Sequence, residues 1–442
     1  MRTFKIGGIH PAGNKLSAGQ PIRTVATPST VAVPLNQHIG APAVATVAKG
    51  DKVKVGTLIG KSGGFVSANV HSPFSGTVGK VDNLIDGSGI ARPAVFIDVE
   101  GDEWEEAIDR SETLVKDCTL TAKEIIDKIA AAGIVGMGGA TFPTHVKLSP
   151  PPGNKANILI INAVECEPYL TADHRLMMEK AEQILVGTSI LMKALSVDSA
   201  VIGIEANKPD AISLMKRLSS EYKGIKIESL KMRYPQGGEK QLIDAITRRQ
   251  VKSGALPISV GAVVQNVGTV FAVYEAVQKN KPLIERVITV TGLKVSQPSN
   301  FLARIGTPVS TLIEAAGGLP DDTGKIIGGG PMMGRAMISA DAPVTKGSSG
   351  ILLVSRDQAA RRPQRDCIRC AKCVGACPMG LEPSLLMNLA ERKIWDKAEE
   401  NYIVDCIECG SCSYTCPANR ALLDYIRLGK ATVMGIIRTR KG

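Results

Sequence analysis

The chain has 442 residues, a net charge of +11 and no apolar run that approaches the length of a transmembrane helix. Its length predicts about three domains, and a composition of 44% hydrophobic and 21% charged residues is typical of globular rather than disordered chains. The positive charge permits contact with nucleic acid, an anionic membrane surface or an acidic protein. The chain shows no nucleic-acid recognition helix or RNA-binding signature, so the first of these is disfavoured.

Residues 1–30 form a lead-in rich in glycine and proline, and residues 30–105 alternate short apolar runs with turns. The spacing of Gly50, Asp51, Val53, Gly56 and Ile59, followed by a Ser-Gly-Thr-Val sequence, resembles the barrel-sandwich fold of biotinyl and lipoyl carriers. Such carriers need a lysine at the hairpin tip, where Phe65 and Val66 stand here, so we expect a structural or docking module. The expected strands are Val31–Pro34, Ala43–Val47, Val53–Val55, Thr57–Ile59, Val66–Val70 and Ser72–Val78.

Residues 115–284 alternate apolar strands with amphipathic helices, a pattern that predicts a parallel α/β sheet. A capping box at Thr121 and Glu124 opens the first helix, which we expect to run to Ala132. The expected strands are Asn157–Asn162, Ala200–Ile204 and Ile225–Leu230, and the further helices are Arg175–Leu195, Pro209–Leu218, Lys240–Arg249 and Val270–Gln278.

A smaller α+β unit follows at residues 285–355, and its order of strand, helix and strand favours a β-grasp fold. The expected elements are Val287–Gly292, Thr311–Ala316 and Lys325–Gly330. A basic linker leads into an α-helical domain at residues 356–430, which includes a predicted helix at Pro383–Lys393. Residues 431–442 are expected to be a basic, partly apolar tail that could lie on a membrane face or on partner subunits. The fold class is therefore multidomain α/β and α+β.

Eight of the ten cysteines form two copies of the run Cys-x-x-Cys-x-x-Cys-x-x-x-Cys-Pro. This is the bacterial ferredoxin pattern for [4Fe–4S] clusters, in which the fourth cysteine of each run binds the other cluster. A zinc site is disfavoured, because zinc prefers two separated pairs of ligands. The predicted ligands are Cys367, Cys370, Cys373 and Cys416 for one cluster, and Cys406, Cys409, Cys412 and Cys377 for the other.

A glycine-rich loop at residues 136–143 is followed by Lys147, and the sequence Asn162-Ala-Val-Glu-Cys-Glu-Pro168 comes directly after a predicted parallel strand. Glycines leave successive backbone N–H groups accessible to a phosphate or a flat ring. Open α/β sheets bind ligands at the carboxyl ends of their strands. The two segments therefore predict one ligand site.

These segments, together with Tyr234-x-x-Gly-x-Glu239 and Asn266-Val-x-Thr269, resemble the flavin- and NADH-binding subunit of respiratory complex I over about 150 residues. The resemblance implies non-covalent FMN and NAD(H) as substrate. Val164, Gly238 and Gln265 depart from that family's pattern. The implied FMN contacts are Gly136, Gly138, Lys147, Asn162, Glu165, Asn266 and Thr269, and the implied NADH contacts are Gly139, Phe142, Glu167 and Glu239.

The full order of modules resembles the C subunits of Rnf electron-transport complexes. The resemblance implies a peripheral subunit on the cytoplasmic face of the bacterial inner membrane. It would link NAD(H), FMN and two clusters to partner subunits that translocate Na⁺ or H⁺, with ferredoxin as an indirect partner. Hydride transfer needs no general acid or base, so no catalytic residue is assigned. Two alternatives stay open: a soluble NADH-dependent reductase, such as a cobalamin reductase, and a non-catalytic iron–sulfur electron wire.

Overall fold

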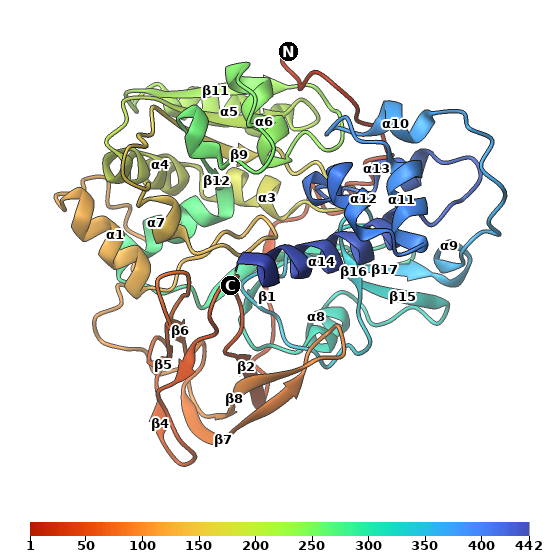
Figure 1. The fold of residues 1–442 in the computed structure, drawn as a ribbon. Helices are drawn as coiled ribbons and strands as arrows, with labels where there is room; N and C mark the ends of the chain where they lie inside the picture. Colours follow the sequence, from red (N-terminus) through yellow and green to blue (C-terminus); the bar gives the residue numbers. More distant parts are fainter. Residues whose placement is uncertain (442) are drawn as a thin grey trace.

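The computed structural model describes residues 1–441, which form four sheets, and the helices lie around the two sheets outside the barrel module (Figure 1). Figure 1 shows the barrel module (β2–β8) at the bottom and the α/β domain (α1–α7) above it. The β-grasp domain (β13–β17) and the cysteine domain (α10–α14) lie to the right. No helix within the described residues is both long and apolar enough to cross a membrane.

The barrel module contains two antiparallel sheets, ordered β2-β8-β7-β4 and β3-β5-β6, with Val33, Val78 and Val95 fully buried between them. The expected strand Val66–Val70 is wrong except at its end. Its residues form a turn because the Ser67 hydroxyl replaces the strand ladder, accepting from Gly63 N and donating to Ala41 O. The strands are β2 (Thr30–Pro34), β3 (Val44–Ala45), β4 (Lys52–Val53), β5 (Leu58–Lys61), β6 (Val70–His71), β7 (Gly76–Ile85) and β8 (Ala91–Val99).

The α/β domain is built on a parallel sheet ordered β11-β10-β9-β12. Both faces are buried: Leu159 and Ile161 of β9 pack with α1, α4, α5 and α7, while Ile160 packs with α6. The strands are β9 (Ile158–Ala163), β10 (Ala200–Glu205), β11 (Ile225–Leu230) and β12 (Ala262–Asn266). The helices are α1 (Ala122–Ala131), α2 (Thr144–Lys147), α3 (Ala172–Glu179), α4 (Ala181–Leu195), α5 (Pro209–Ser219), α6 (Glu239–Thr247), η1 (Pro257–Val260) and α7 (Val267–Lys279).

The capping box that begins α1 is present, with Thr121 and Glu124 satisfying each other's backbone N–H groups. The single helix expected over Arg175–Leu195 is wrong. It is two helices, because Lys180 (φ −131°, ψ 34°) leaves helical geometry between α3 and α4.

The β-grasp domain is a mixed six-stranded sheet ordered β1-β14-β13-β17-β15-β16, with α8 packed on it. The small α+β unit predicted here is therefore present. Its edge strand β1 comes from the N-terminal lead-in and pairs in parallel with β14, which the sequence did not indicate. The elements are β1 (Ile22–Thr24), β13 (Glu285–Thr291), β14 (Ser299–Arg304), α8 (Val309–Ala315), β15 (Thr323–Gly328), β16 (Arg335–Ala336) and β17 (Gly350–Ser355).

The cysteine domain is helical and has its own apolar core around Leu386, Ile403 and Ile426. The expected tail is not separate from it, because α14 continues through Val433, which is fully buried, to its end at Lys441. The elements are α9 (Arg356–Ala359), α10 (Lys372–Ala376), α11 (Pro383–Glu391), α12 (Trp395–Glu400), η2 (Ile403–Asp405), α13 (Ser411–Thr415) and α14 (Leu422–Lys441).

The N-terminal residues 2–24, here called the strap, lie along three domains. Ile9 exchanges two backbone hydrogen bonds of 2.9 Å with Tyr234 of the α/β domain. Gly8 N donates to Ala376 O of the cysteine domain over 2.9 Å. Gly7 lies so close to Cys377 that a Cβ there would be 2.3 Å from its carbonyl, and its φ of +67° also favours glycine. The strap therefore joins the α/β and cysteine domains along the backbone.

Candidate functional site

The first predicted site lies at the carboxyl edge of the parallel sheet. Strands β9 and β12 are neighbours, and Asn162 and Asn266 are direct register partners at their ends. Asn162 Nδ2 donates to Gly237 O over 2.8 Å, which draws the Tyr234–Glu239 segment to the same edge. Three of the separate sequence motifs are thus brought together here.

The glycine-rich loop folds over this edge. Its two ends are closed by a hydrogen bond of 2.9 Å from Gly136 N to Phe142 O. The buried Thr269 hydroxyl accepts from Met137 N over 2.8 Å, so Thr269 fixes the loop to α7. That bond gives Thr269 a structural role in addition to its predicted contact with FMN.

Gly138 and Gly139 form the exposed crest of the loop. A Cβ on Gly138 would lie 3.3 Å from the Asn266 side chain, so glycine preserves the space between the loop and Asn266. Gly139 has φ +115°, a conformation that glycine adopts without strain, and nothing lies within 4 Å of its missing Cβ. The crest therefore offers open backbone of the kind that a phosphate or flat ring can approach.

Lys147, the predicted phosphate partner, forms a 2.8 Å ion pair with Glu239, which was predicted to contact NADH. The two side chains are 30% and 40% exposed. An ion pair at this level of exposure contributes little stability. A phosphate bound at the loop could therefore pair with Lys147 in place of Glu239 with little loss of stability.

The Asn266 side chain is fully engaged. Its Oδ1 accepts from Gly268 N over 2.9 Å and caps α7, and its Nδ2 donates to Asp173 Oδ2 over 2.7 Å. The neighbouring Gln265 is buried, and its Nε2 has no hydrogen-bond partner within residues 1–441. A buried donor without a partner carries a desolvation cost that a polar ligand could relieve. Gln265, which departs from the family pattern, thus suits a polar cofactor at this edge.

The Glu165 side chain caps the start of α3. Its carboxylate accepts from Asp173 N over 2.7 Å and from His174 N over 3.2 Å, both in the first turn of α3. Its backbone is left-handed, with φ +47°. Lys15 of the strap donates to the carbonyls of Glu165, Glu167 and Leu170 over 2.9, 2.8 and 2.6 Å. One lysine, far away in sequence, therefore fixes the whole Glu165–Leu170 loop.

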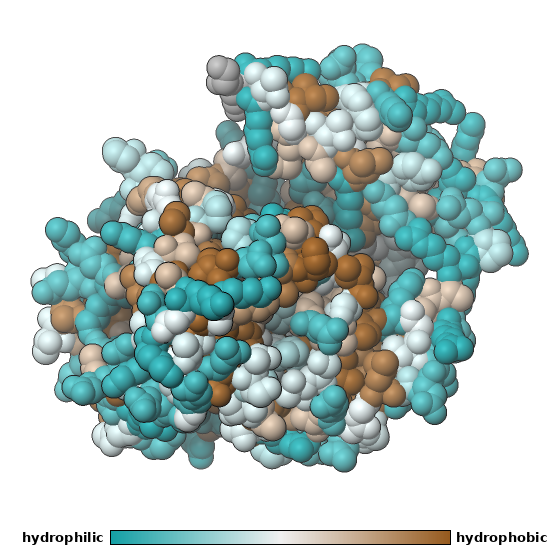
Figure 2. Space-filling view, turned by 90° about the horizontal axis from the view of Figure 1, so that it is seen from below, coloured by the Kyte–Doolittle hydropathy of each residue, from teal (hydrophilic) through white to brown (hydrophobic). Residues whose placement is uncertain are grey.

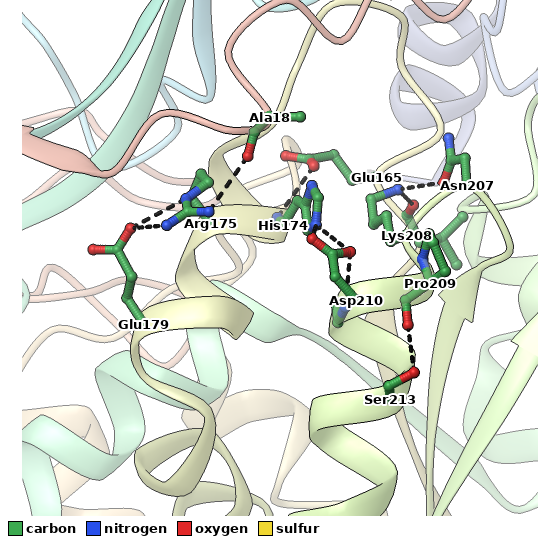
Figure 3. A network of polar contacts seen from close by, with 12 residues as sticks. Ala18, Glu165, His174, Arg175, Glu179, Asn207, Lys208, Pro209, Asp210 and Ser213 are labelled. Carbon is green, nitrogen blue, oxygen red and sulfur yellow. Dashed lines mark hydrogen bonds and ion pairs between the residues drawn. The ribbon is translucent and has the colours of Figure 1, made fainter.

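Buried ionisable side chains lie beside that loop, and Figure 3 shows Lys208 and His174 close to Glu165. Lys208 is 2% exposed and donates to Val164 O over 2.7 Å, and burial lowers its pKa. Burial raises the pKa of Glu205, and it also raises the pKa of Asp173 to about 7, with further help from Glu165. Perturbed ionisable groups cluster at functional sites, which agrees with a ligand site at this edge.

Glu167 lies apart from the other predicted contacts. Its carboxylate accepts from the backbone N–H groups of Met332 (3.2 Å) and Met333 (2.8 Å) in the β-grasp domain. Burial raises its pKa, while these two N–H groups oppose that shift. A Cβ on Gly330 would lie 2.3 Å from the Glu167 carboxylate, so the β-grasp loop closes directly over it. In this structure Glu167 joins two domains.

The second predicted site is a small apolar cavity in the cysteine domain. Four cysteines line it, namely Cys377 of the first run and Cys406, Cys409 and Cys412 of the second. This is the crossed set predicted from the ferredoxin pattern. Cys377 Sγ and Cys406 Sγ each accept a backbone N–H over 3.4 Å, from Leu381 and Glu408 respectively. Burial raises the pKa of Cys412 to about 12, so its thiolate form needs the positive charge of bound iron.

The other predicted set lies at the surface. Cys367 and Cys370 are exposed, and Cys373 and Cys416 are half-buried. The backbone of this run repeats that of the second run: Arg369 and Ala371 have φ of +55° and +56°, and Glu408 and Gly410 have +57° and +77°. The two loops thus share one conformation, although one is buried and the other is open.

The four thiols that line this one cavity come from both cysteine runs, as the ferredoxin pattern for two [4Fe–4S] clusters requires. A zinc site would instead take its ligands as two separated pairs. The geometry of the buried set therefore supports the iron–sulfur assignment.

The two sites meet at a small apolar cluster. It contains Ile9 of the strap, Cys166 and Tyr234 of the α/β domain, and Cys409 of the cavity. The buried Tyr234 hydroxyl donates to Cys409 O over 2.8 Å. Gln241 Nε2 donates to Pro378 O over 3.2 Å beside it. The buried cysteine set therefore borders the α/β domain, and the exposed set does not line this contact.

Sequence reasoning missed several residues of the site. Lys15, Asp173, Lys208 and Arg286 carry no motif, and each acquires its role only through tertiary contacts. Arg286 is buried and donates to Met137 O of the glycine-rich loop over 3.3 Å. Two of them had a weak signal in the sequence, because each follows a predicted strand at the start of a helix. Asp173 lies in the first turn of α3, and Lys208 immediately precedes α5.

Comparison with protein-family models gives four matches along the chain. Residues 3–102 match the RnfC barrel sandwich hybrid domain, and residues 129–275 match the Nuo51 FMN-binding domain. Residues 287–336 match the SLBB domain, and residues 360–417 match a 4Fe-4S dicluster domain. The predicted fold class is thereby confirmed.

Curated relatives match the chain along its length. It is 47% identical over 437 residues to the C subunit of the proton-translocating ferredoxin:NAD(+) oxidoreductase complex of Clostridium ljungdahlii, covering 98% of this chain and 94% of that one. It is 44% identical to the C subunit of the Na(+)-translocating complex of Acetobacterium woodii, covering 100% and 98%. Among solved structures, an air-oxidized NAD+-reducing [NiFe]-hydrogenase shares the fold, with a TM-score of 0.51, 19% identity, and coverage of 71% and 66%.

Proposed function

Because the chain belongs to the family of C subunits of ion-translocating ferredoxin:NAD(+) oxidoreductase complexes, we propose that it exchanges electrons between NAD(H) and its partner subunits. FMN and two [4Fe–4S] clusters would be its cofactors, in keeping with the matched FMN-binding and dicluster domains. Bound FMN supplies the conversion between a two-electron hydride and single electrons, which iron–sulfur clusters carry.

The chain's own residues would hold and orient these groups. Gly138 and Gly139 would approach the FMN phosphate or ring, Lys147 would neutralise the phosphate, and Asn162 and Asn266 would line the edge. Lys15 would not contact FMN but would hold the Glu165–Leu170 loop, and Arg286 would hold the glycine-rich loop. The open crest of the loop and the partnerless Gln265 Nε2 are what support FMN here.

The observation that carries the proposal is the contact between the two sites. Tyr234 and Cys409 are hydrogen-bonded across the domain boundary, and the apolar cluster around them is buried. We therefore assign the buried cysteine set as the cluster nearer the flavin, and the exposed set around Cys367 and Cys370 as the outer one. Exposed basic side chains lie within the outer run and just before it in the chain: Arg361, which pairs with Asp424, and Arg362, Arg365, Arg369 and Lys372. These charges would offset a negatively charged cluster and favour an acidic partner surface.

We further propose attachment to the cytoplasmic face of the bacterial inner membrane through partner subunits, with ferredoxin reaching the chain indirectly. Figure 2 shows the face seen from below, where hydrophobic residues gather around a recess beneath the projecting lobe that carries the end of the chain. Leu428 (57% exposed) and Met434 (37% exposed) of α14 add exposed apolar surface for such an assembly.

The test uses the full chain reconstituted anaerobically with FMN, iron and sulfide. Adding NADH should bleach both the flavin and the cluster absorbance. The Gly138→Val variant should lose FMN and keep its iron, because its side chain enters the space beside Asn266. Gly19→Val is the matched control, since no atom lies near its missing Cβ. A chain that binds iron but no FMN would refute the proposal and leave the electron-wire alternative.

A further inference from the structure

The tip of the β5–β6 hairpin lies against the glycine-rich loop of the α/β domain. This tip is where a carrier protein would hold its modified lysine, and here it presents Phe65. The His145 Nε2 atom donates to Phe65 O over 3.0 Å, and the two rings meet edge to face with centroids 6.0 Å apart. His145 lies in α2, two residues before Lys147. The hairpin tip is therefore fixed to the helix that carries the predicted phosphate partner.

A second contact joins the barrel module to the loop itself. Ile39 N donates to Thr141 O over 3.4 Å. Thr141 is two residues, about 7 Å of extended chain, from Gly139. The Phe65 tip is also rigid, because Ala41 N donates to Val66 O over 3.0 Å and Gly40 leaves no room there for a side chain. The barrel module thus borders the open crest of the glycine-rich loop.

Both apolar side chains at this border face solvent. Phe65 is 65% exposed and Ile39 is 50% exposed, although their backbones are held in place by the contacts above. The edge-to-face contact with His145 holds the Phe65 ring in place and leaves most of it exposed, so its open face suits a flat, stackable ligand. Stacking of an aromatic side chain on a nucleic acid base contributes about 1–3 kcal/mol.

We propose that Phe65, supported by Ile39, forms the stacking surface for the adenine ring of the nicotinamide dinucleotide. Phe65 is then a specificity-determining residue that the barrel module contributes to a site in another domain, and His145 is the positioning residue that holds it. The proposal rests on the proposed function, since it takes a dinucleotide to bind at the glycine-rich loop. It gives the barrel module, which lacks a carrier lysine, a role in substrate recognition.

The first test measures binding without any redox step. Calorimetry on the full chain with ADP-ribose, which has the adenine but no nicotinamide, should show a Kd that rises about 5- to 150-fold in Phe65→Ala. Phe65→Trp should restore binding. Val44→Ala, on an equally exposed apolar residue of the same module, should leave the Kd unchanged.

The second test compares two substrates in the loaded chain. With ferricyanide as acceptor, Phe65→Ala should raise KM about 5- to 150-fold for NADH and leave KM unchanged for reduced nicotinamide mononucleotide, which lacks adenosine. Equal effects on the two substrates, or an unchanged Kd for ADP-ribose, would overturn the proposal. If ADP-ribose binds through Phe65 while NADH reduces nothing, the proposed function fails and the adenine site stands.

Discussion

Lys15 is not itself a predicted cofactor contact, but its loss should disturb the loop that carries Glu165 and Glu167, which are. Its ammonium group donates to three carbonyls of the Glu165–Leu170 loop, over 2.9, 2.8 and 2.6 Å. Hydrogen bonds from a charged donor contribute about 1.5–3 kcal/mol each, and they are not additive around one group. We therefore expect Lys15→Met to lower the local stability of this loop by about 2–4 kcal/mol.

The assay is hydrogen exchange of the amides from 165 to 174, read by mass spectrometry. A loss of that size predicts roughly 30- to 700-fold faster exchange there, and weaker FMN binding follows because Glu165 no longer holds the start of α3. Lys52→Met is the matched control, because its 2.8 Å pair with Glu100 is exposed and contributes little. Exchange in Lys15→Met that stays within threefold of the parent chain would refute the reasoning.

Three further predictions concern the cavity, the domain boundary and a buried cation. Cys377→Ala should reduce the iron content from about eight to about four atoms per chain, because Cys377 lines the buried cavity. The control Cys118→Ala should keep the full iron content. A full iron content in Cys377→Ala would contradict the crossed assignment of the cysteines. Tyr234→Phe should lower the free energy of unfolding by about 1–2 kcal/mol in thermal unfolding, because Cys409 O loses its hydrogen-bond donor. The control Tyr222→Phe should be neutral or stabilising, because the buried Tyr222 hydroxyl has no partner in the described chain. Equal melting temperatures of the two variants would contradict this prediction. Burial lowers the pKa of Lys346 from 10.5 to about 7, so between these pH values the unfolded chain carries a proton that the folded chain lacks. The stability of the parent relative to Lys346→Met should therefore rise over pH 7–10, by at most about 1.4 kcal/mol per pH unit. A stability difference that does not change with pH would show that the hydrogen bonds to Asn69 O and Gly133 O keep the lysine charged.

The modules of this chain could be predicted from the sequence because their signals are local. The capping box at Thr121, the apolar strand Ile158–Ala163 and the two cysteine runs each carry their information within a few residues. The crossed cysteine set follows from the ferredoxin pattern, and it lines one cavity in the structure. Local signals also fail locally: the break at Lys180 has no glycine or proline to mark it, so two helices read as one.

The contacts between modules could not be predicted, because they depend on residues that have no periodicity and no motif. In the sequence, nothing distinguishes Lys15 from other lysines in extended segments. Its role comes from the carbonyls of Glu165, Glu167 and Leu170, which the fold brings to its ammonium group. Glu167 follows the family motif, yet its carboxylate is held by backbone N–H groups of a domain more than 150 residues away. A sequence motif therefore identifies the side chains that can contact a cofactor, whereas the residues that hold those side chains in place come from distant parts of the chain.

The strap has a consequence for how the molecule is made. Residues 7–9 contact Ala376 O and the Cys377 backbone, which lie more than 360 residues further along the chain, so these contacts can form only after the first cysteine run has been synthesised. The α/β domain can take up Ile9 through Tyr234 long before the cysteine domain arrives. A chain that has not yet folded its cysteine domain therefore leaves one side of residues 7–9 uncovered, and the folding of that domain around Ala376 and Cys377 covers it.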